Sequence, residues 1–257
     1  MRHEELVWPL RLMSKRAAAC PGLLHGDKEV DLISFPERLL VVVAHPDDEV
    51  LGCGATIAEV NAQGGDVMVL ILSEGATTQY PDRPDLVEQK RREAVCALEA
   101  LGGGQLRRAD LPDMRMALHP PAEVAAPITT AIEEFEPGWL ITHHGSDLNS
   151  DHRVVHEAAR VAARPSSRKA VALLAMEVPS STEYGYQAPQ PNVVVPIDLR
   201  SLEAKCTSLR CYESEIRPYP HGRSIEAVRA LAAYRGYTSG CELAEVFELV
   251  WARTEPR

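Results

Sequence analysis

The sequence lacks several features that would place it in a common class. None of its apolar runs reaches the roughly 18 residues that a transmembrane helix needs. It has no block of basic residues, and its net charge of −10 argues against a nucleic-acid surface. The first 20 residues carry charges through their apolar stretch, which is not the pattern of a signal peptide. We therefore expect a cytoplasmic protein with no transmembrane segment and no nucleic-acid partner.

The cysteines form no C-x-x-C pair and are scattered along the chain. There are six of them: Cys20, Cys53, Cys96, Cys206, Cys211 and Cys241. In a chain of this size the pattern predicts reduced thiols, and it indicates neither a disulfide framework nor a zinc ribbon.

The hydropathy pattern alternates between strands and helices. Buried strands are expected over 39–44 and 66–72, a short strand over 105–111, further strands over 137–142 and 170–176, and helices over 49–63, 86–101, 122–135 and 151–163. This alternation predicts an α/β fold, a three-layer Rossmann-like architecture with a mostly parallel sheet and helices on both faces.

The pattern changes after Pro179. We expect helices over 201–215 and 225–235, a last strand over 245–250, and a strand over 192–197 whose prolines suit a sheet edge. The expected organisation is one domain over residues 38–257, preceded by an N-terminal arm or helix over residues 1–37. The sequence leaves open whether the protein forms a homo-oligomer.

Two polar loops follow predicted strands. The first is His45-Pro46-Asp47-Asp48-Glu49, which places one imidazole and three carboxylates at a strand end. The second follows the strand over 137–142 and offers His143, His144, Asp147, Asp151, His152 and His156. In a parallel sheet both loops lie at the same edge, where α/β proteins bind ligands.

Two imidazoles and one carboxylate form a common open catalytic metal site, and both zinc and ferrous iron accept this ligand set. His45 and Asp48 can point inward together, which leaves Asp47 beside the attacking water as a base. Purely structural roles are also open for several of these residues. Asp48 and Asp151 suit helix N-caps, Glu49 suits a helix N-terminus, and His156 suits a structural position.

Other motif readings have weaker support. His45-x-Asp47 with His152 fits the facial triad of non-haem iron oxygenases, although those sites usually lie on all-β scaffolds. Gly52-Cys53-Gly54 resembles the start of a dinucleotide fingerprint, but Ile57 replaces its third glycine. No G-x-S-x-G elbow is present to support a serine hydrolase triad.

The segment AHPDDEVLGCGATIA resembles the first signature of the PIG-L/LmbE-like zinc-dependent N-deacetylases, and THHGSDLNSDHRVV resembles the second. His152 follows His45 by 107 residues, a spacing that suits this family. The resemblance covers residues 38–160 and extends to the Lys90-Arg91-Arg92-Glu93 and Leu111-Pro112-Asp113 segments.

The resemblance implies that His45, Asp48 and His152 bind Zn²⁺ or Fe²⁺ and that Asp47 is the general base. Many members carry a histidine where this chain has Asn149, so Asn149 and His144 are the candidate oxyanion donors. His144, Asp47 or His221 is left to protonate the amine.

The resemblance further implies a metal-dependent hydrolase that removes acetyl from a small N-acetylated amino sugar or sugar conjugate. The candidate substrate-binding residues are Glu74, Arg91, Arg92, Asp113, Arg217, His221 and Arg223. The alternatives are a mononuclear iron oxygenase with the same triad and a non-catalytic metal-binding α/β domain.

Overall fold

A single mixed sheet forms the centre of the protein. The computed structural model describes residues 35–78, 80–165 and 172–253. Its strands are β1 (Arg38–Val43), β2 (Asp66–Ser73), β3 (Gln105–Leu111), β4 (Trp139–His143), β5 (Ala172–Met176), β6 (Val193–Pro196) and β7 (Ala244–Ala252). They lie in the order β3-β2-β1-β4-β5-β7-β6. β1 to β5 are parallel, and β7 runs antiparallel to its neighbours β5 and β6. The mostly parallel sheet is confirmed, and β6 lies at an edge.

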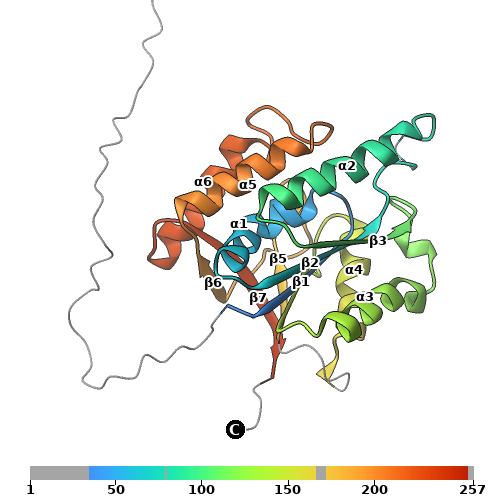
Figure 1. Ribbon diagram of the computed structural model, residues 1–257, viewed down its shortest axis with the longest axis horizontal. Coiled ribbons are helices and arrows are strands. Elements are labelled where there is room, and N and C mark those ends of the chain that lie inside the picture. Colours follow the sequence, from blue (N-terminus) through green and yellow to red (C-terminus); the bar gives the residue numbers. More distant parts are fainter. Residues whose placement is uncertain (1–34, 79, 166–171, 254–257) are drawn as a thin grey trace, which may run out of the picture. The chain divides into compact units, whose positions relative to one another are not determined.

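Helices cover both faces of this sheet (Figure 1). One face carries α1 (Asp48–Ala62), α2 (Asp85–Ala100), α5 (Leu199–Cys211) and α6 (Ile225–Ser239), and the other carries α3 (Pro121–Phe135) and α4 (Ser150–Ala162). Two single-turn 3₁₀ helices, η1 (Met116–Leu118) and η3 (Thr182–Tyr184), lie in connections. The predicted three-layer architecture is confirmed. In the described part of the chain, no helix is both long and apolar enough to cross a bilayer.

The central strand β1 explains why the two polar loops meet. Its β-branched and leucine side chains are buried on both faces, as expected for a parallel strand between two helix layers. β1 pairs in parallel with β4, with Leu39 opposite Trp139 and Val41 opposite Ile141. Both strands therefore end at the same edge, and the loops that follow them are neighbours.

The Gly52-Cys53-Gly54 segment marks a kink in α1. Cys53 has non-helical dihedral angles, φ −147° and ψ 23°. Beyond the kink, the Glu245 carboxylate from β7 accepts a hydrogen bond from the N–H of Thr56 at 2.7 Å and so caps the second half of the helix. A Cβ at Gly52 would lie 2.3 Å from Sδ of Met176. These glycines thus serve helix packing, which accounts for them without a bound dinucleotide.

The cysteine prediction is wrong for two residues. Cys96 on α2 and Cys211 at the end of α5 form a disulfide with a Cα–Cα distance of 5.9 Å. The partners are 115 residues apart, so only the packing of α2 on α5 brings them together. Cys53, Cys206 and Cys241 are free thiols. Cys20, like the predicted arm or helix over 1–37 up to residue 34, lies outside the described residues.

We predict that Cys96→Ser and Cys211→Ser each lower the free energy of unfolding by about 2–4 kcal/mol, because the cross-link restricts the unfolded chain. Thermal unfolding under non-reducing conditions measures the effect. Cys241→Ser is the control, and its melting temperature should stay close to that of the wild type. A non-reducing peptide map without a linked Cys96–Cys211 peptide would contradict the disulfide.

Candidate metal centre

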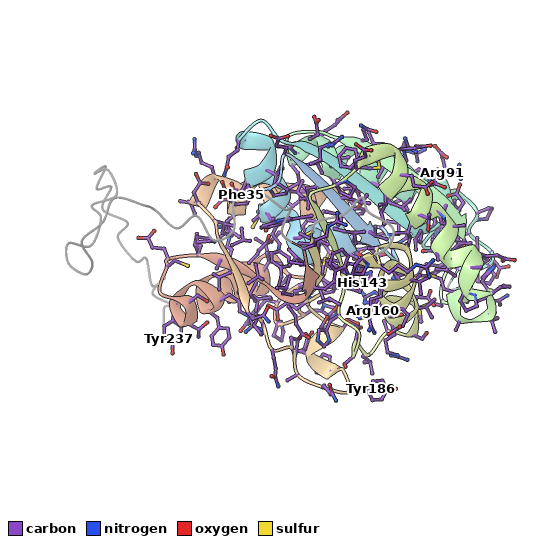
Figure 2. All side chains as sticks on the ribbon, turned by 90° about the horizontal axis from the view of Figure 1, so that it is seen from below. Phe35, Arg91, His143, Arg160, Tyr186 and Tyr237 are labelled. Carbon is purple, nitrogen blue, oxygen red and sulfur yellow. A yellow bond between two sulfur atoms is a disulfide. The ribbon has the colours of Figure 1, made fainter. Side chains whose placement is uncertain are left out.

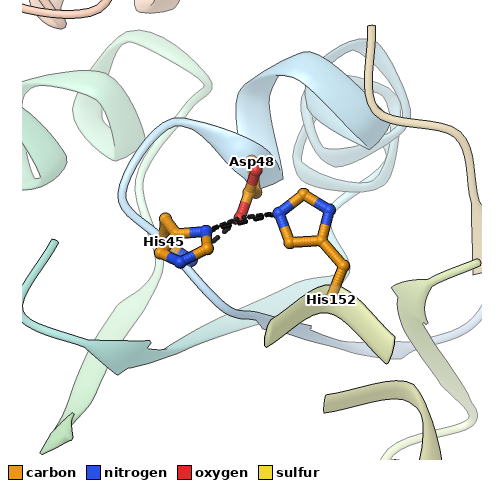
Figure 3. Close-up of side chains that lie close together, drawn as sticks. All are labelled: His45, Asp48 and His152. Atoms are coloured by element: carbon orange, nitrogen blue, oxygen red, sulfur yellow. Dashed lines mark hydrogen bonds and ion pairs between the residues drawn. The ribbon is translucent and has the colours of Figure 1, made fainter. Parts of the chain in front are cut away.

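Three side-chain atoms converge at the carboxyl ends of β1 and β4 (Figure 3). Nδ1 of His45, Oδ2 of Asp48 and Nε2 of His152 lie 3.3 Å from one another in every pairing. Ligands bound at about 2.0–2.2 Å in a tetrahedron are separated by about 3.3–3.6 Å. The spacing therefore fits one divalent cation with an open fourth position. It is one of two groups of this kind among the described residues.

Local structure fixes each of these ligands. His45 lies in the turn between β1 and α1, and Asp48 is the first residue of α1, where its Oδ2 also accepts the N–H of His45 at 2.8 Å. His152 lies in the first turn of α4. That helix begins after Asn149, whose Oδ1 accepts the N–H of Asp151 at 2.9 Å. The side chain of Asn149 therefore takes the N-cap role, and its Nδ2 lies 3.8 Å from Sδ of Met114 at the cleft.

A carboxylate lies behind each histidine. Nε2 of His45 is 3.3 Å from Oδ2 of Asp151 and 3.4 Å from Oδ1 of Asp113. These three residues are the second group of possible metal ligands. Nδ1 of His152 is 3.2 Å from Oδ1 of Asp147. A carboxylate on one ring nitrogen holds the proton there and leaves the other nitrogen free to bind a metal. We therefore infer that the two carboxylates of the second group orient the His45 ring.

The metal-free site has a strong preference for bound protons. Burial by itself lowers the pKa of both histidines, but the carboxylates outweigh it. Hydrogen bonds to Asp151 and Asp48 raise the pKa of His45 to about 10, and Asp48 and Asp147 raise that of His152 to about 9. Burial likewise opposes ionisation of Asp48, but His152 and its neighbours hold the Asp48 pKa well below its usual range. A divalent cation would take the place of these protons.

Asp47 lies next to Asp48 in the sequence, but its side chain points away from the three candidate ligands. Its side chain lines the cleft, and its Oδ2 lies 3.3 Å from Nη1 of Arg223. Burial and the adjacent Asp48 carboxylate raise the pKa of Asp47, while the charge of Arg223 opposes this. A carboxylate with a raised pKa is suited to accept a proton near neutral pH.

His143, the last residue of β4, and His144, which follows it, point in opposite directions, because side chains alternate along an extended chain. His143 is fully buried and stacks on His152 with ring centroids 3.9 Å apart. Its Nε2 accepts the N–H of Ala44 at 2.8 Å. His144 faces Glu248 at 3.2 Å and lines a different cleft, so the structure does not bring this predicted donor to the ligands. His156 is structural, with Nδ1 bonded to the carbonyl of His143 at 2.8 Å.

The cleft over the ligands has a volume of about 420 Å³, within the usual range for small-molecule sites. One wall is a chain of charges in which Lys90 pairs with Glu215 and Glu215 pairs with Arg223. Asp113 also lines the cleft, and its Oδ2 is buried and has no hydrogen-bond partner among the described residues. Burial raises the pKa of Asp113, and nearby His45 opposes this. Such an unpartnered atom in a cleft is suited to bind a polar ligand.

Among the predicted substrate-binding residues, Asp113 and Arg223 line this cleft and the others do not. Glu74 instead supports Asp113 by accepting its N–H at 3.1 Å. Arg217 donates to the carbonyls of Ser214 and Ile216, and His221 is exposed.

Arg91 and Arg92 lie on the outer face of α2, and Figure 2 shows Arg91 at the periphery while His143 lies near the middle. Lys90, buried on the same helix, takes the place at the cleft. Lys90, Arg91 and Arg92 compete for this place in the sequence, and the helical spacing of Lys90 from Leu86 and Ala94 separates it from the two arginines. Glu215 had no sequence signal.

The fold and the site define an α/β protein with a His–Asp–His group that could hold a metal ion. Residues 40–163 match the model of the PIG-L family, described as GlcNAc-PI de-N-acetylase. The match spans just under half of the chain and includes both signatures, so the resemblance to this family is confirmed.

Characterised relatives include deacetylases of amino sugars. A 1D-myo-inositol 2-acetamido-2-deoxy-α-D-glucopyranoside deacetylase from Kineococcus radiotolerans is 30% identical over 163 residues, covering 50% of this chain and 45% of that protein. The chain thus spans about half the length of that relative. Diacetylchitobiose deacetylase from Thermococcus kodakarensis is 27% identical over 225 residues, with 83% of each chain covered.

A solved structure shows that the same fold is used for another reaction. The 4-carboxy-2-hydroxymuconate hydratase GalB from Pseudomonas putida superimposes with a TM-score of 0.67 and 20% identity, covering 86% of this chain and 98% of that one. The fold alone therefore does not decide the reaction.

We predict that His45→Ala and His152→Ala lose most of the bound metal, because each removes one of three protein ligands. Elemental analysis after dialysis against a metal buffer measures the content. His144→Ala is the matched control, because its imidazole lines the other cleft, and it should bind as much metal as the wild type. Full metal occupancy in both ligand variants would contradict the assignment.

Proposed function

We propose that this protein is a zinc-dependent N-deacetylase that removes the acetyl group from an N-acetylated amino sugar or sugar conjugate. The observation that supports it most is the convergence of His45, Asp48 and His152 beside the carboxylate of Asp47. The match to the PIG-L family and the names of the relatives favour amide hydrolysis over the oxygenase and binding-module alternatives. We take zinc as the metal because two imidazoles and a carboxylate with an open position form a common zinc site.

A bound zinc ion would polarise the acetyl carbonyl and lower the pKa of water towards about 7. Asp47 then accepts the proton of the attacking water, since its carboxylate lines the cleft next to the ligands. Neither His144 nor His221 lines this cleft. The proton that leaves with the amine is therefore most simply returned by Asp47, which acts first as base and then as acid.

The walls of the cleft favour a polyhydroxylated substrate. Asp113 offers a carboxylate oxygen without a hydrogen-bond partner, and Lys90, Glu215 and Arg223 present both charge signs in the same cleft. Sugar hydroxyl groups both donate and accept hydrogen bonds, so they match these polar groups. Met114 and Leu148 lie at the same cleft and are exposed, which leaves apolar surface beside the polar groups.

A location in the cytoplasm is expected from the sequence alone. The disulfide between Cys96 and Cys211 is more typical of an oxidising compartment, since cytosolic thiols are usually kept reduced.

The test is incubation of zinc-loaded protein with N-acetylglucosamine, N,N′-diacetylchitobiose and N-acetylglucosamine glycosides. We expect free amine and acetate in equal amounts. Oxygen uptake would indicate an oxygenase instead, and no product from any N-acetyl sugar would contradict the proposal.

We predict that Asp47→Asn keeps its zinc while kcat falls by about 10²-fold or more, the usual scale for loss of an acid–base group. Asp48→Asn should lose zinc, because it removes a ligand. Zinc content and kcat per bound zinc, measured on both variants, separate the roles. Equal zinc loss in the two variants would show that the adjacent carboxylates are wrongly assigned.

We predict that Lys90→Ala raises KM by about tenfold, the effect of losing one hydrogen bond to a charged group. Arg91→Ala, one residue along the same helix but outside the cleft, should leave KM unchanged. Steady-state kinetics on one sugar compares the two. An equal effect of both substitutions would argue against the cleft wall as the sugar site.

A further inference from the structure

We propose that Glu49 and Tyr212 form a positioning pair that holds the main chain of Asp47 in the conformation its role requires. The inference rests on the proposed function, in which Asp47 is the base, and assigns a task to two buried residues that do not line the cleft.

The main chain of Asp47 is unusual. Its φ is 110° and its ψ −25°, beyond the left-handed region near +50° to +70° that asparagine and aspartate sometimes adopt. The other described non-glycine residues with positive φ, namely Asp110, Met114, Glu136 and Ser180, have values of 48° to 77°. A conformation of this kind persists only where its surroundings enforce it.

This main-chain conformation lets the adjacent carboxylates of Asp47 and Asp48 point in different directions and take different roles. Oδ2 of Asp48 turns back to the N–H of His45 and faces His152. The side chain of Asp47 leaves in another direction, towards Arg223. With an ordinary extended or helical residue at this position, the base and the ligand could not both keep these directions.

Glu49 is the group that enforces it. Its Oε2 accepts the main-chain N–H of Asp47 at 3.2 Å, and its Oε1 accepts the hydroxyl of Tyr212 at 2.5 Å. Glu49 is 2% exposed and Tyr212 is 0% exposed. Each carboxylate oxygen thus has one donor, and the tyrosine hydroxyl fixes the rotamer that reaches Asp47.

Tyr212 belongs to the segment that also holds the side chain of Asp47. It follows Cys211 directly, and the same segment continues to Glu215 and Arg223. Asp47 is therefore held at its main chain through Glu49 and at its carboxylate through Arg223. The disulfide at Cys211 fixes the start of this segment to α2.

A double-mutant cycle tests the pair. Glu49→Gln leaves one acceptor for two buried donors, so we expect kcat per bound zinc to fall by about tenfold with KM and zinc content unchanged. Tyr212→Phe removes one donor and should cost about threefold. In the double variant the amide oxygen is free for the N–H of Asp47, so kcat should recover to near that of Tyr212→Phe.

Glu245→Gln is the matched control. Glu245 is also buried, accepts several donors and supports α1, but it lies at the kink rather than at the base. It should lower the melting temperature without lowering kcat per bound zinc. Wild-type kcat in Glu49→Gln, or a double variant with the product of the two single losses, would overturn the proposal.

A readout independent of activity separates this inference from the proposed function. In a crystal structure of Glu49→Gln we expect φ of Asp47 to leave the region near 110° and its carboxylate to move by about 1 Å or more. An unchanged Asp47 would overturn the positioning role even if the wild type hydrolyses no N-acetyl sugar. If Asp47 moves but the wild type releases no acetate, only the proposed reaction fails.

Discussion

The parallel pairing of β1 with β4 is the constraint on which the site depends. The two strands are adjacent in the sheet but about 100 residues apart in the chain, and their register places Val41 opposite Ile141. Parallel neighbours end at the same edge, so the loop that carries His45 and Asp48 faces the loop that leads to His152. Because both strands are buried by helices on each face, this edge is one of the few places where polar groups can gather.

The gathered groups carry far more negative than positive charge. Buried carboxylates around the cleft outnumber its cations, the buried Lys90 and the partly exposed Arg223; they are Asp47, Asp48, Glu49, Glu74, Asp113, Asp147 and Asp151. Burying unpaired charge is costly, and without metal the protein meets that cost with protons on His45 and His152. A divalent cation bound by His45, Asp48 and His152 would offset this imbalance, and the carboxylates behind the histidines would orient their rings.

The last third of the chain completes what the two loops begin. β7 lies antiparallel in an otherwise parallel sheet, and its Glu245 stabilises the kinked α1 together with Lys205 of α5. The segment after α5 reaches back over the cleft with Glu215 and Arg223.

The alternation of strands and helices, the two polar loops and the candidate triad of metal ligands could be predicted from the sequence, because they depend on local periodicity and on a short motif. Tertiary structure decided which of several residues adjacent in the sequence face the site. It turned His144 away and His143 inward, gave Asn149 a capping contact, and chose Lys90 over Arg91 for the cleft. It also joined Cys96 to Cys211 and Glu49 to Tyr212. These pairings join residues far apart in the chain, or depend on which face of an element is buried, and only packing fixes both.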